Sequence, residues 1–260
     1  LAIQTDAHSL FLKRWWDLLN QQSKNAPSNS ALKNLSQVDT IWEGTASPDA
    51  VSYRLTRAWR LEVSNRIEEM LLAPAIDKLG KKSSKPGYTG FDYEAPGFIG
   101  FEDVAWQLIQ QKPKHLLTRN YKNWDDLFEQ AAQQVQSELL EIGPLNERTW
   151  GERNTAAICH PLAAALPGFI KPILCMPKDQ LEGDSDMPLV ISPTFGASER
   201  MVVSPGHEED GIIHMPGGQS GHFLSPFWGA GHDDWVQHKP TPFLPGKTEY
   251  ALTLLAIKNK

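Results

Sequence analysis

The sequence has little of several features that define whole classes of protein. Only two of its 260 residues are cysteines, too few for a disulfide scaffold. Its most apolar region, 156–174, is interrupted by three prolines, which excludes a membrane-spanning helix of about 18 apolar residues. The net charge is −6 and the basic residues are scattered, so no basic patch exists for nucleic acid or an anionic membrane. We therefore expect a soluble protein with neither kind of partner.

The composition otherwise fits a folded domain. Hydrophobic residues make up 40% and charged residues 22% of the chain, which excludes a disordered or coiled-coil protein. Residue 1 is Leu rather than Met, and no signal-peptide pattern follows it. We expect a segment of a longer chain or a mature product, and this beginning leaves the compartment of the parent protein open.

The two cysteines have two interpretations. Cys159 and Cys175 could form a disulfide that closes a short loop if the protein is exported. The interpretation we favour from the sequence is a pair of small, buried hydrophobic residues.

Hydrophobic periodicity predicts helices in residues 1–145. The expected buried faces consist of Leu10, Phe11, Trp15, Leu18 and Leu19; of Val51, Leu55, Trp59, Val63, Ile67 and Leu71; and of Trp124, Leu127, Phe128, Ala131, Val135 and Leu139. In the second helix we place Arg54, Arg57, Arg60 and Glu68 elsewhere around the axis. A shorter helix is expected over 102–111, and the Lys/Ser/Gly/Pro-rich segment 80–100 is expected to be an exposed insertion.

The composition changes after residue 145. Twelve of the 19 prolines and 12 of the 19 glycines lie beyond Trp150, so short strands replace long helices. The expected strands are 155–158, 189–192, 200–203, 211–214 and 250–257. We predict an α+β chain with a mainly helical region, 1–145, and a strand-rich region, 146–260. Such a small sheet would leave open edges, which favours one fragment of a larger protein.

Five of the eight histidines lie in the last quarter of the chain, close to several carboxylates. Imidazole and carboxylate ligands suit zinc or iron, so a metal-dependent hydrolase using His207, His214, His222 or His232 is one alternative. No two of these histidines have HxH or HExxH spacing. The segment 207–210 follows Pro205-Gly206 and is expected to be a solvated turn, so we predict no metal site.

The run Gly217-Gly218-Gln219-Ser220-Gly221-His222 looks like a nucleophile elbow, but histidine occupies the position of its last required glycine. We expect a tight turn with a positive φ at one or more glycines.

Two further features are polar or aromatic. The run Gly183-Asp184-Ser185-Asp186 resembles part of a calcium loop, but Leu189 stands where that loop needs glycine. We expect a polar turn whose carboxylates accept hydrogen bonds from backbone N–H groups. Trp228 and Trp235 lie among glycines and could give a non-catalytic binding module a ligand surface.

Three runs in the last part of the chain closely resemble the C-terminal end of the penicillin acylase (penicillin amidase) family. They are Phe195-Gly196-Ala197-Ser198-Glu199-Arg200-Met201-Val202-Val203, Met215-Pro216-Gly217-Gly218-Gln219-Ser220-Gly221-His222 and Leu224-Ser225-Pro226. The runs Cys159-His160-Pro161-Leu162, Leu166-Pro167-Gly168 and 183–186 are similar to the preceding segment of that family, and 235–255 to its closing stretch. Residues 3–9 and Trp42-Glu43-Gly44 fit the middle of its β subunit.

This resemblance implies an N-terminal-nucleophile hydrolase with a four-layer αββα sandwich. Its precursor, a zymogen, cuts itself into α and β subunits, and the new N-terminal serine attacks a linear amide with its own α-amino group as base. The implied substrates are the acyl side chains of β-lactam antibiotics or acyl-homoserine lactones. The implied partners are the rest of the β subunit and the α subunit, and the implied compartment is the periplasm or outside the cell.

The catalytic residues of the family cannot be matched to positions in this sequence. The resemblance places the serine, the oxyanion asparagine and the calcium ligands upstream of residue 1, so this segment needs no cofactor and any calcium would be bound by the full-length protein. We assign no catalytic residue here and expect the segment alone to be inactive. Only Glu199 and Arg200, at the start of an expected strand, are candidates for supporting a catalytic group, with a structural ion pair or surface charge as the alternative.

Overall fold

The computed structural model describes residues 1–79, 101–156, 158–192, 195–197, 199–248 and 251–256. The chain divides into two compact units. Unit 2 spans Asp6–Gly196, and unit 1 combines Leu1–Thr5 with Ala197–Lys260. The change of composition near residue 145 therefore falls inside unit 2. The segment 80–100, which we expected to be an exposed insertion, lies outside the described residues.

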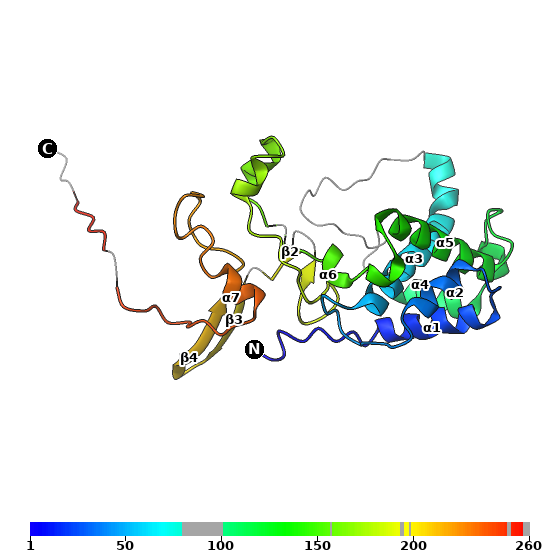
Figure 1. The fold of residues 1–260 in the computed structure, drawn as a ribbon, viewed down its shortest axis with the longest axis horizontal. Coiled ribbons are helices and arrows are strands. Elements are labelled where there is room, and N and C mark those ends of the chain that lie inside the picture. Colours follow the sequence, from blue (N-terminus) through cyan, green and yellow to red (C-terminus); the bar gives the residue numbers. More distant parts are fainter. Residues whose placement is uncertain (80–100, 157, 193–194, 198, 249–250, 257–260) are drawn as a thin grey trace. The chain divides into compact units, whose positions relative to one another are not determined.

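Unit 2 is built mainly from helices (Figure 1). The α-helices are α1 Leu12–Asn25, α2 Ala31–Val38, α3 Val51–Leu79, α4 Phe101–Gln111, α5 Trp124–Ile142 and the short α6 Trp150–Arg153. The 3-10 turns are η1 Lys114–Leu116, η2 Leu145–Glu147, η3 Pro161–Ala165 and η4 Lys171–Leu174. Helix α3 packs against α1, α4 and α5, while α2 packs against α1 and α5. Among the described helices, none combines the length and the apolar character needed to cross a bilayer.

The predicted helical faces largely form the core of unit 2. All six residues expected on the inner face of α5 are buried, as are the four central residues expected on that of α3. Trp59 lies at the centre, edge-on to Trp15 and Phe128, with ring centroids 6.0 and 5.9 Å away. Leu10 was wrongly predicted as buried, because helix α1 begins only at Leu12 and leaves the Leu10 side chain 91% exposed.

Side-chain caps mark where two of these helices begin. The Ser30 hydroxyl accepts a hydrogen bond from the Lys33 amide at the start of α2. The Asn123 side chain accepts one from the Asp126 amide at the start of α5. Each contact satisfies an N–H group that the first helical turn leaves without an intrahelical partner. The sequence therefore fixes both helix starts locally.

The strands make the chain α+β, as predicted. In unit 2, β1 Ile191–Ser192 pairs antiparallel with β2 Phe195–Gly196. In unit 1, β3 Arg200–Ser204 pairs antiparallel with β4 His207–His214, with Arg200 opposite His214.

Three strand-region predictions differ from the structure. The segment 207–210 was wrongly predicted as a solvated turn, because the chain reverses one step earlier, at Pro205-Gly206, where Gly206 has φ +82°. Within 155–158, in the residues that the structure describes, only an isolated bridge from Thr155 to Gln180 is found. Residues 251–256 have no regular secondary structure, and the ends of that expected strand lie outside the described residues.

Cys159 and Cys175 form a disulfide with an S–S distance of 2.06 Å. The interpretation favoured from the sequence, two unpaired buried thiols, is therefore wrong. The two residues also face each other in an isolated antiparallel bridge. Periodicity alone could not show this, because the turns η3 and η4 between them bring the cysteines together.

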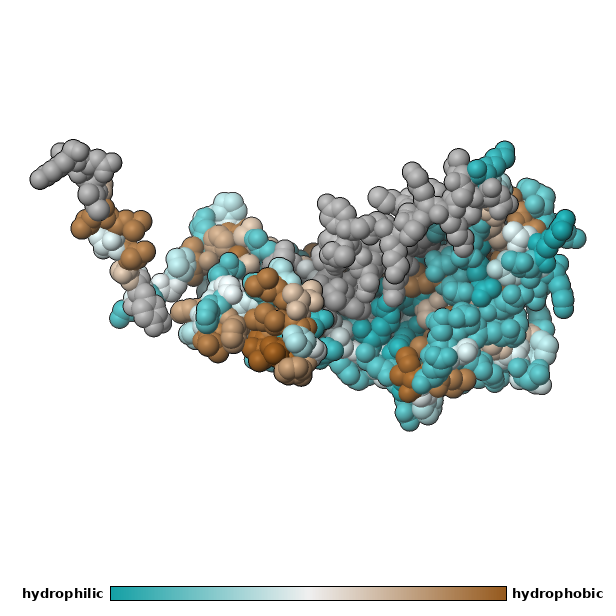
Figure 2. All heavy atoms as spheres, turned by 90° about the horizontal axis from the view of Figure 1, so that it is seen from above, coloured by the Kyte–Doolittle hydropathy of each residue, from teal (hydrophilic) through white to brown (hydrophobic). Residues whose placement is uncertain are grey.

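Unit 1 has the β3–β4 hairpin, the short helix α7 His232–Val236 and a long irregular segment. Its apolar side chains are mostly exposed, and the brown side chains near the chain end in Figure 2 belong to this unit. Leu252, Leu254 and Leu255 are each more than 80% exposed. Trp235, on α7, is fully buried, and its indole N–H donates to the Ala197 carbonyl over 3.1 Å.

Candidate functional site

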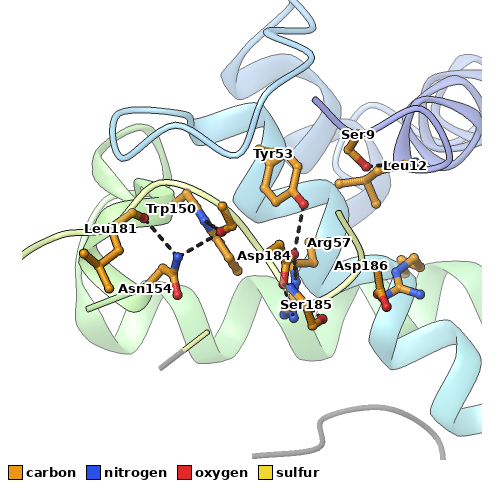
Figure 3. A network of polar contacts seen from close by, with 12 residues as sticks. Ser9, Leu12, Tyr53, Arg57, Trp150, Asn154, Leu181, Asp184, Ser185 and Asp186 are labelled. Carbon is orange, nitrogen blue, oxygen red and sulfur yellow. Dashed lines mark hydrogen bonds and ion pairs between the residues drawn. The ribbon is translucent and has the colours of Figure 1, made fainter. Parts of the chain in front are cut away.

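The most extensive buried polar network in the described part of unit 2 joins helix α3 to the turn 183–186 (Figure 3). Arg57 Nε donates to Asp184 Oδ2 over 2.5 Å, and Arg57 Nη2 donates to Oδ1 over 3.0 Å. The Tyr53 hydroxyl donates to Oδ2 over 2.9 Å. Asp184 Oδ1 also accepts the Ser185 amide over 2.7 Å, as expected for a polar turn. The carboxylate is thus surrounded by donors on both oxygens.

These contacts fix the protonation states of the network. Burial by itself would raise the pKa of Asp184, but the Arg57 charge and the hydrogen bonds to both oxygens outweigh it, so the pKa is lowered. Burial, followed by the Asp184 charge, raises the pKa of Tyr53 far above its ordinary value. Asp184 therefore stays ionised and Tyr53 stays protonated, so neither side chain acts as an acid or base near neutral pH.

The turn itself needs a glycine before Asp184. Gly183 has φ +100°, and a Cβ atom there would lie 2.4 Å from the Leu189 carbonyl oxygen. Its own carbonyl accepts from the Trp150 indole over 2.8 Å and from Asn154 Nδ2 over 2.9 Å. The network therefore joins α3, α6 and the turn into one rigid assembly, and its chemistry is positioning rather than proton transfer.

A second cluster connects α1, α3 and α4 through Glu102. Its carboxylate accepts from Arg14 Nη2 over 2.8 Å, from the Trp15 indole over 2.6 Å and from Arg60 Nη1 over 2.8 Å. Burial would raise the pKa of Glu102, but the Arg60 charge and these hydrogen bonds outweigh it and lower the pKa. This carboxylate also stays ionised and ties three helices together.

A groove of about 480 Å³ lies between α3, α5 and α6. Leu61, Val135 and Leu139 line its apolar part, and Arg54 and Arg57 line its polar part. Arg54 Nη1 is paired with Glu152 Oε2 at 2.5 Å, and Arg57 with Asp184. The lining also includes Glu62, Glu138 and Arg153, so the groove offers a mixed apolar and charged surface.

The sequence did not reveal that the arginines of α3 form buried ion pairs. Arg54, Arg57 and Arg60 are 5%, 7% and 8% exposed, although we placed them around the helix away from its apolar face. The signal was present in the turn Gly183-Asp184-Ser185-Asp186, where the expected hydrogen bond from a backbone N–H is confirmed for Asp184. The sequence could not show which cation Asp184 meets, since Arg57 and Asp184 are 127 positions apart.

The C-terminal histidines do not gather into one site in the part of the chain that the structure describes. His232 Nδ1 donates to the Pro216 carbonyl over 2.6 Å, and His214 Nε2 donates to the Lys239 carbonyl. His222 is exposed, and its Nδ1 accepts the Leu224 amide over 3.2 Å. The described residues hold a single group with metal-ligand geometry, His207, Glu209 and Asp210, and all three are exposed. An exposed set of this kind is common without an ion and does not make a catalytic centre.

Among the described residues, no imidazole is within hydrogen-bond distance of the Ser220 hydroxyl. This hydroxyl accepts the His222 amide over 3.1 Å rather than facing an imidazole ring. The neighbouring Gly218 is required by a close approach, because a Cβ atom there would lie 1.7 Å from the Phe227 carbonyl oxygen. Neither Gly218 nor Gly221 has the positive φ that we expected of this segment. The segment 217–222 bends without the expected tight turn, and a hydrogen-bonded turn follows only at His222–Ser225.

The two tryptophans of the proposed binding module lie in different environments. Trp235 is fully buried, so its expected surface role is wrong. Trp228 is half-buried, and its amide donates to the Ser225 carbonyl over 3.0 Å. A shared ligand platform is therefore not formed by these two rings.

Glu199 and Arg200 lie at the beginning of β3 with opposite exposures. Glu199 is exposed, whereas Arg200 is 2% exposed. No ion pair joins them among the described residues. Of the two candidates for supporting a catalytic group, Arg200 therefore has a buried side chain and Glu199 a side chain that faces solvent.

Comparison with known proteins gives one strong match. The family model described as penicillin amidase matches residues 1–250. No curated protein matches the sequence. The match includes the helical region, the Arg57–Asp184 network and the hairpin, and it agrees with the resemblance carried by the 195–226 segment. Since it covers nearly the whole sequence, the chain belongs to the penicillin amidase family.

Proposed function

We propose that this chain is the C-terminal part of the β subunit of a penicillin-acylase-like amidase. The observation that carries this proposal is the family match over residues 1–250. The rest of the β subunit and the α subunit of the same precursor are its partners. Together they complete an αββα sandwich, to which this chain contributes helices and short strands.

The proposed reaction is hydrolysis of a linear amide by an N-terminal serine. Autoproteolysis of the precursor exposes that serine, whose α-amino group serves as base, and an oxyanion hole stabilises the tetrahedral intermediate. The serine is supplied upstream of residue 1.

The contribution of this chain is a rigid scaffold. Ion pairs to Glu102 join helices α1, α3 and α4. The Arg57–Asp184 pair ties α3 to the turn 183–186, and the Arg54–Glu152 pair ties α3 to α6. Catalytic groups must be held to within a fraction of an ångström, and rigid elements provide that support better than loops. By itself the chain has no activity on amides under this proposal.

The proposed substrates are small acyl amides, either acylated β-lactams or acyl-homoserine lactones. An apolar acyl pocket discriminates by only about 1–3 kcal/mol per methylene, so acyl chain length is the variable to test. The proposed compartment is the periplasm or outside the cell. The Cys159–Cys175 disulfide supports it, because disulfides persist in oxidising compartments. Calcium, if required, is bound by the full-length protein outside this chain.

The deciding experiment is expression of the full-length parent gene, followed by intact mass and N-terminal sequencing of the products. We expect two chains, the larger beginning with Ser and ending with the present sequence. The purified product should release p-nitroaniline from an acyl p-nitroanilide, and changing the new N-terminal Ser to Ala should abolish this release. A single uncut chain without amidase activity would contradict the proposal, and so would amide turnover by residues 1–260 alone.

A further inference from the structure

Arg200 is a buried cation in unit 1. It opens β3 directly opposite His214 of β4, and both side chains are 2% exposed. Its guanidinium carbon lies 5.0 Å from the centre of the Trp235 ring. Arg200 Nη1 donates to the Trp235 carbonyl over 3.0 Å and to His238 Nδ1 over 2.8 Å. One nitrogen and one side of the guanidinium are thus occupied.

The other two nitrogens have no acceptor among the residues that the structure describes. Arg200 Nε and Nη2 are buried and have no hydrogen-bond partner. These two N–H groups form one edge of the planar guanidinium, the edge that pairs side-on with two oxygens of a carboxylate. His214 Nδ1, on the opposite strand, is also buried without a partner. The interior of unit 1 therefore contains polar atoms that its described residues leave unsatisfied.

Three arginines of unit 2 have the carboxylate partner that Arg200 lacks within the described part of the chain. Arg57 meets Asp184, Arg60 meets Glu102, and Arg148 meets Glu152. No salt bridge to Arg200 exists among the residues described. Burial alone lowers the pKa of Arg200 to about 10, and no carboxylate counteracts that effect, so the group is charged at neutral pH. A buried charge is normally paired, and one without a counter-ion indicates a partner still to be bound.

We propose that the Nε–Nη2 edge of Arg200 binds one carboxylate group through two parallel hydrogen bonds. The Trp235 ring covers the guanidinium and the backbone and His238 occupy Nη1, so the carboxylate lies in the guanidinium plane at the free edge. The bound carboxylate can come from two sources with the same chemistry: an Asp or Glu side chain of the protein, or a free carboxylic acid. This proposal does not rest on the proposed amidase activity, because it depends only on contacts within unit 1.

The test is NMR of the Arg200 Nε–H group in ¹⁵N,¹³C-labelled protein, assigned through the Arg200 backbone. Sodium [1-¹³C]acetate is the probe, with acetamide and sodium chloride at matched concentration as controls. Binding of the free acid would shift the Nε–H signal saturably and produce a coupling across the hydrogen bond to the acetate carboxyl carbon. A protein side chain would instead give that coupling to an Asp or Glu carboxyl carbon without acetate. Absence of any coupling to a carboxyl carbon, with no response to acetate, would overturn the proposal.

Variants sharpen the result. Arg200→Lys keeps the charge but removes the two parallel N–H donors of the guanidinium edge. Acetate binding should therefore weaken at least about tenfold. Arg66→Lys is the matched control, because Arg66 pairs with Glu62 on the surface of α3 and should leave acetate binding unchanged. Equal acetate binding by Arg200→Lys and the unmodified protein would contradict bidentate binding. The assigned titration of the unmodified protein remains decisive if Arg200→Lys does not fold.

Discussion

Units 2 and 1 bury different kinds of side chain. Unit 2 has an apolar core in which Trp59, Phe128 and many aliphatic residues are fully buried. In the described part of unit 1, Trp235 is the one large hydrophobic residue that is buried, accompanied by Arg200, His214 and His232. Hydrophobic burial dominates the folding free energy, so we expect unit 2 to gain more stability from its own core than unit 1 does. Two parts of one family member therefore differ in how much of their stability an apolar core supplies.

The largest effect is expected from breaking the buried ion pair of unit 2. Asp184→Asn removes the charge that compensates Arg57 while keeping the side-chain shape. It should destabilise unit 2 by about 3–5 kcal/mol, because a buried guanidinium is left unpaired. Urea unfolding followed by circular dichroism measures this loss.

Asp186→Asn is the matched control for Asp184→Asn. The Asp186 side chain is 56% exposed and lies 3.7 Å from Arg60. Because Asp186 faces solvent and its contact with Arg60 is long, we expect this pair to contribute less than about 1 kcal/mol. Equal losses from the two variants would contradict the buried role of Asp184.

Two tryptophan substitutions test the autonomy of the units. Trp59→Ala should cost unit 2 about 3–5 kcal/mol, the usual range for a large aromatic removed from a packed core. Trp235→Ala should leave the unfolding of unit 2 unchanged and alter only NMR signals of unit 1. Both residues are fully buried, so burial alone would predict equal effects. A similar shift of the unit 2 midpoint by both variants would show that the units unfold together.

The sequence predicted the fold of unit 2 better than its polar network, for a physical reason. A helix face repeats locally, so Trp124, Leu127 and Phe128 could be assigned to the core from spacing alone. The Arg57–Asp184 pair and the disulfide join positions that are near only after folding. The same limit applies to Arg200, where the residue could be singled out but its burial and unpaired edge could not.

Removing the disulfide should have a somewhat smaller effect. The cysteines are 16 positions apart, and a loop of that size contributes about 3 kcal/mol in the chain-entropy model. The double variant Cys159→Ser/Cys175→Ser should therefore lower the melting temperature, with unit 1 signals unaffected. Mixing with dithiothreitol should lower the melting temperature of the unmodified protein only. An unchanged midpoint in both experiments would mean that the two segments are held by other contacts.

Acid should destabilise the two units in different pH ranges, and this effect is the smallest. In unit 1, burial followed by the Arg200 and His214 charges lowers the pKa of His238 to about 4, from 6.5. The unfolded state then binds the proton first, so unit 1 loses stability as pH falls from 6.5 towards 4. In unit 2 the pKa values of Asp184 and Glu102 are lowered from 3.8 and 4.5, so its stability is present above those values and lost below them.

His238→Asn checks the assignment for unit 1. His238 has φ +56°, a conformation that asparagine tolerates better than most residues. In this variant the folded fraction of unit 1, measured from the intensities of its native NMR signals, should no longer fall between pH 6.5 and 4, while the acid transition of unit 2 stays in place. A pH dependence of unit 1 that persists in His238→Asn would assign it to another group.

The indole arrangement in unit 2 has a spectroscopic consequence. Trp15 lies edge-on to Trp59 and also to Trp106, whose ring centroid is 5.5 Å away. Trp16 stacks on Trp42, which stacks on Tyr53. Rings this close and fixed in orientation couple their electronic transitions, so ultraviolet circular dichroism carries a signal that depends on their mutual angles. Because α1 and α3 contribute to both sets, that signal reports the packing of these helices without any added label.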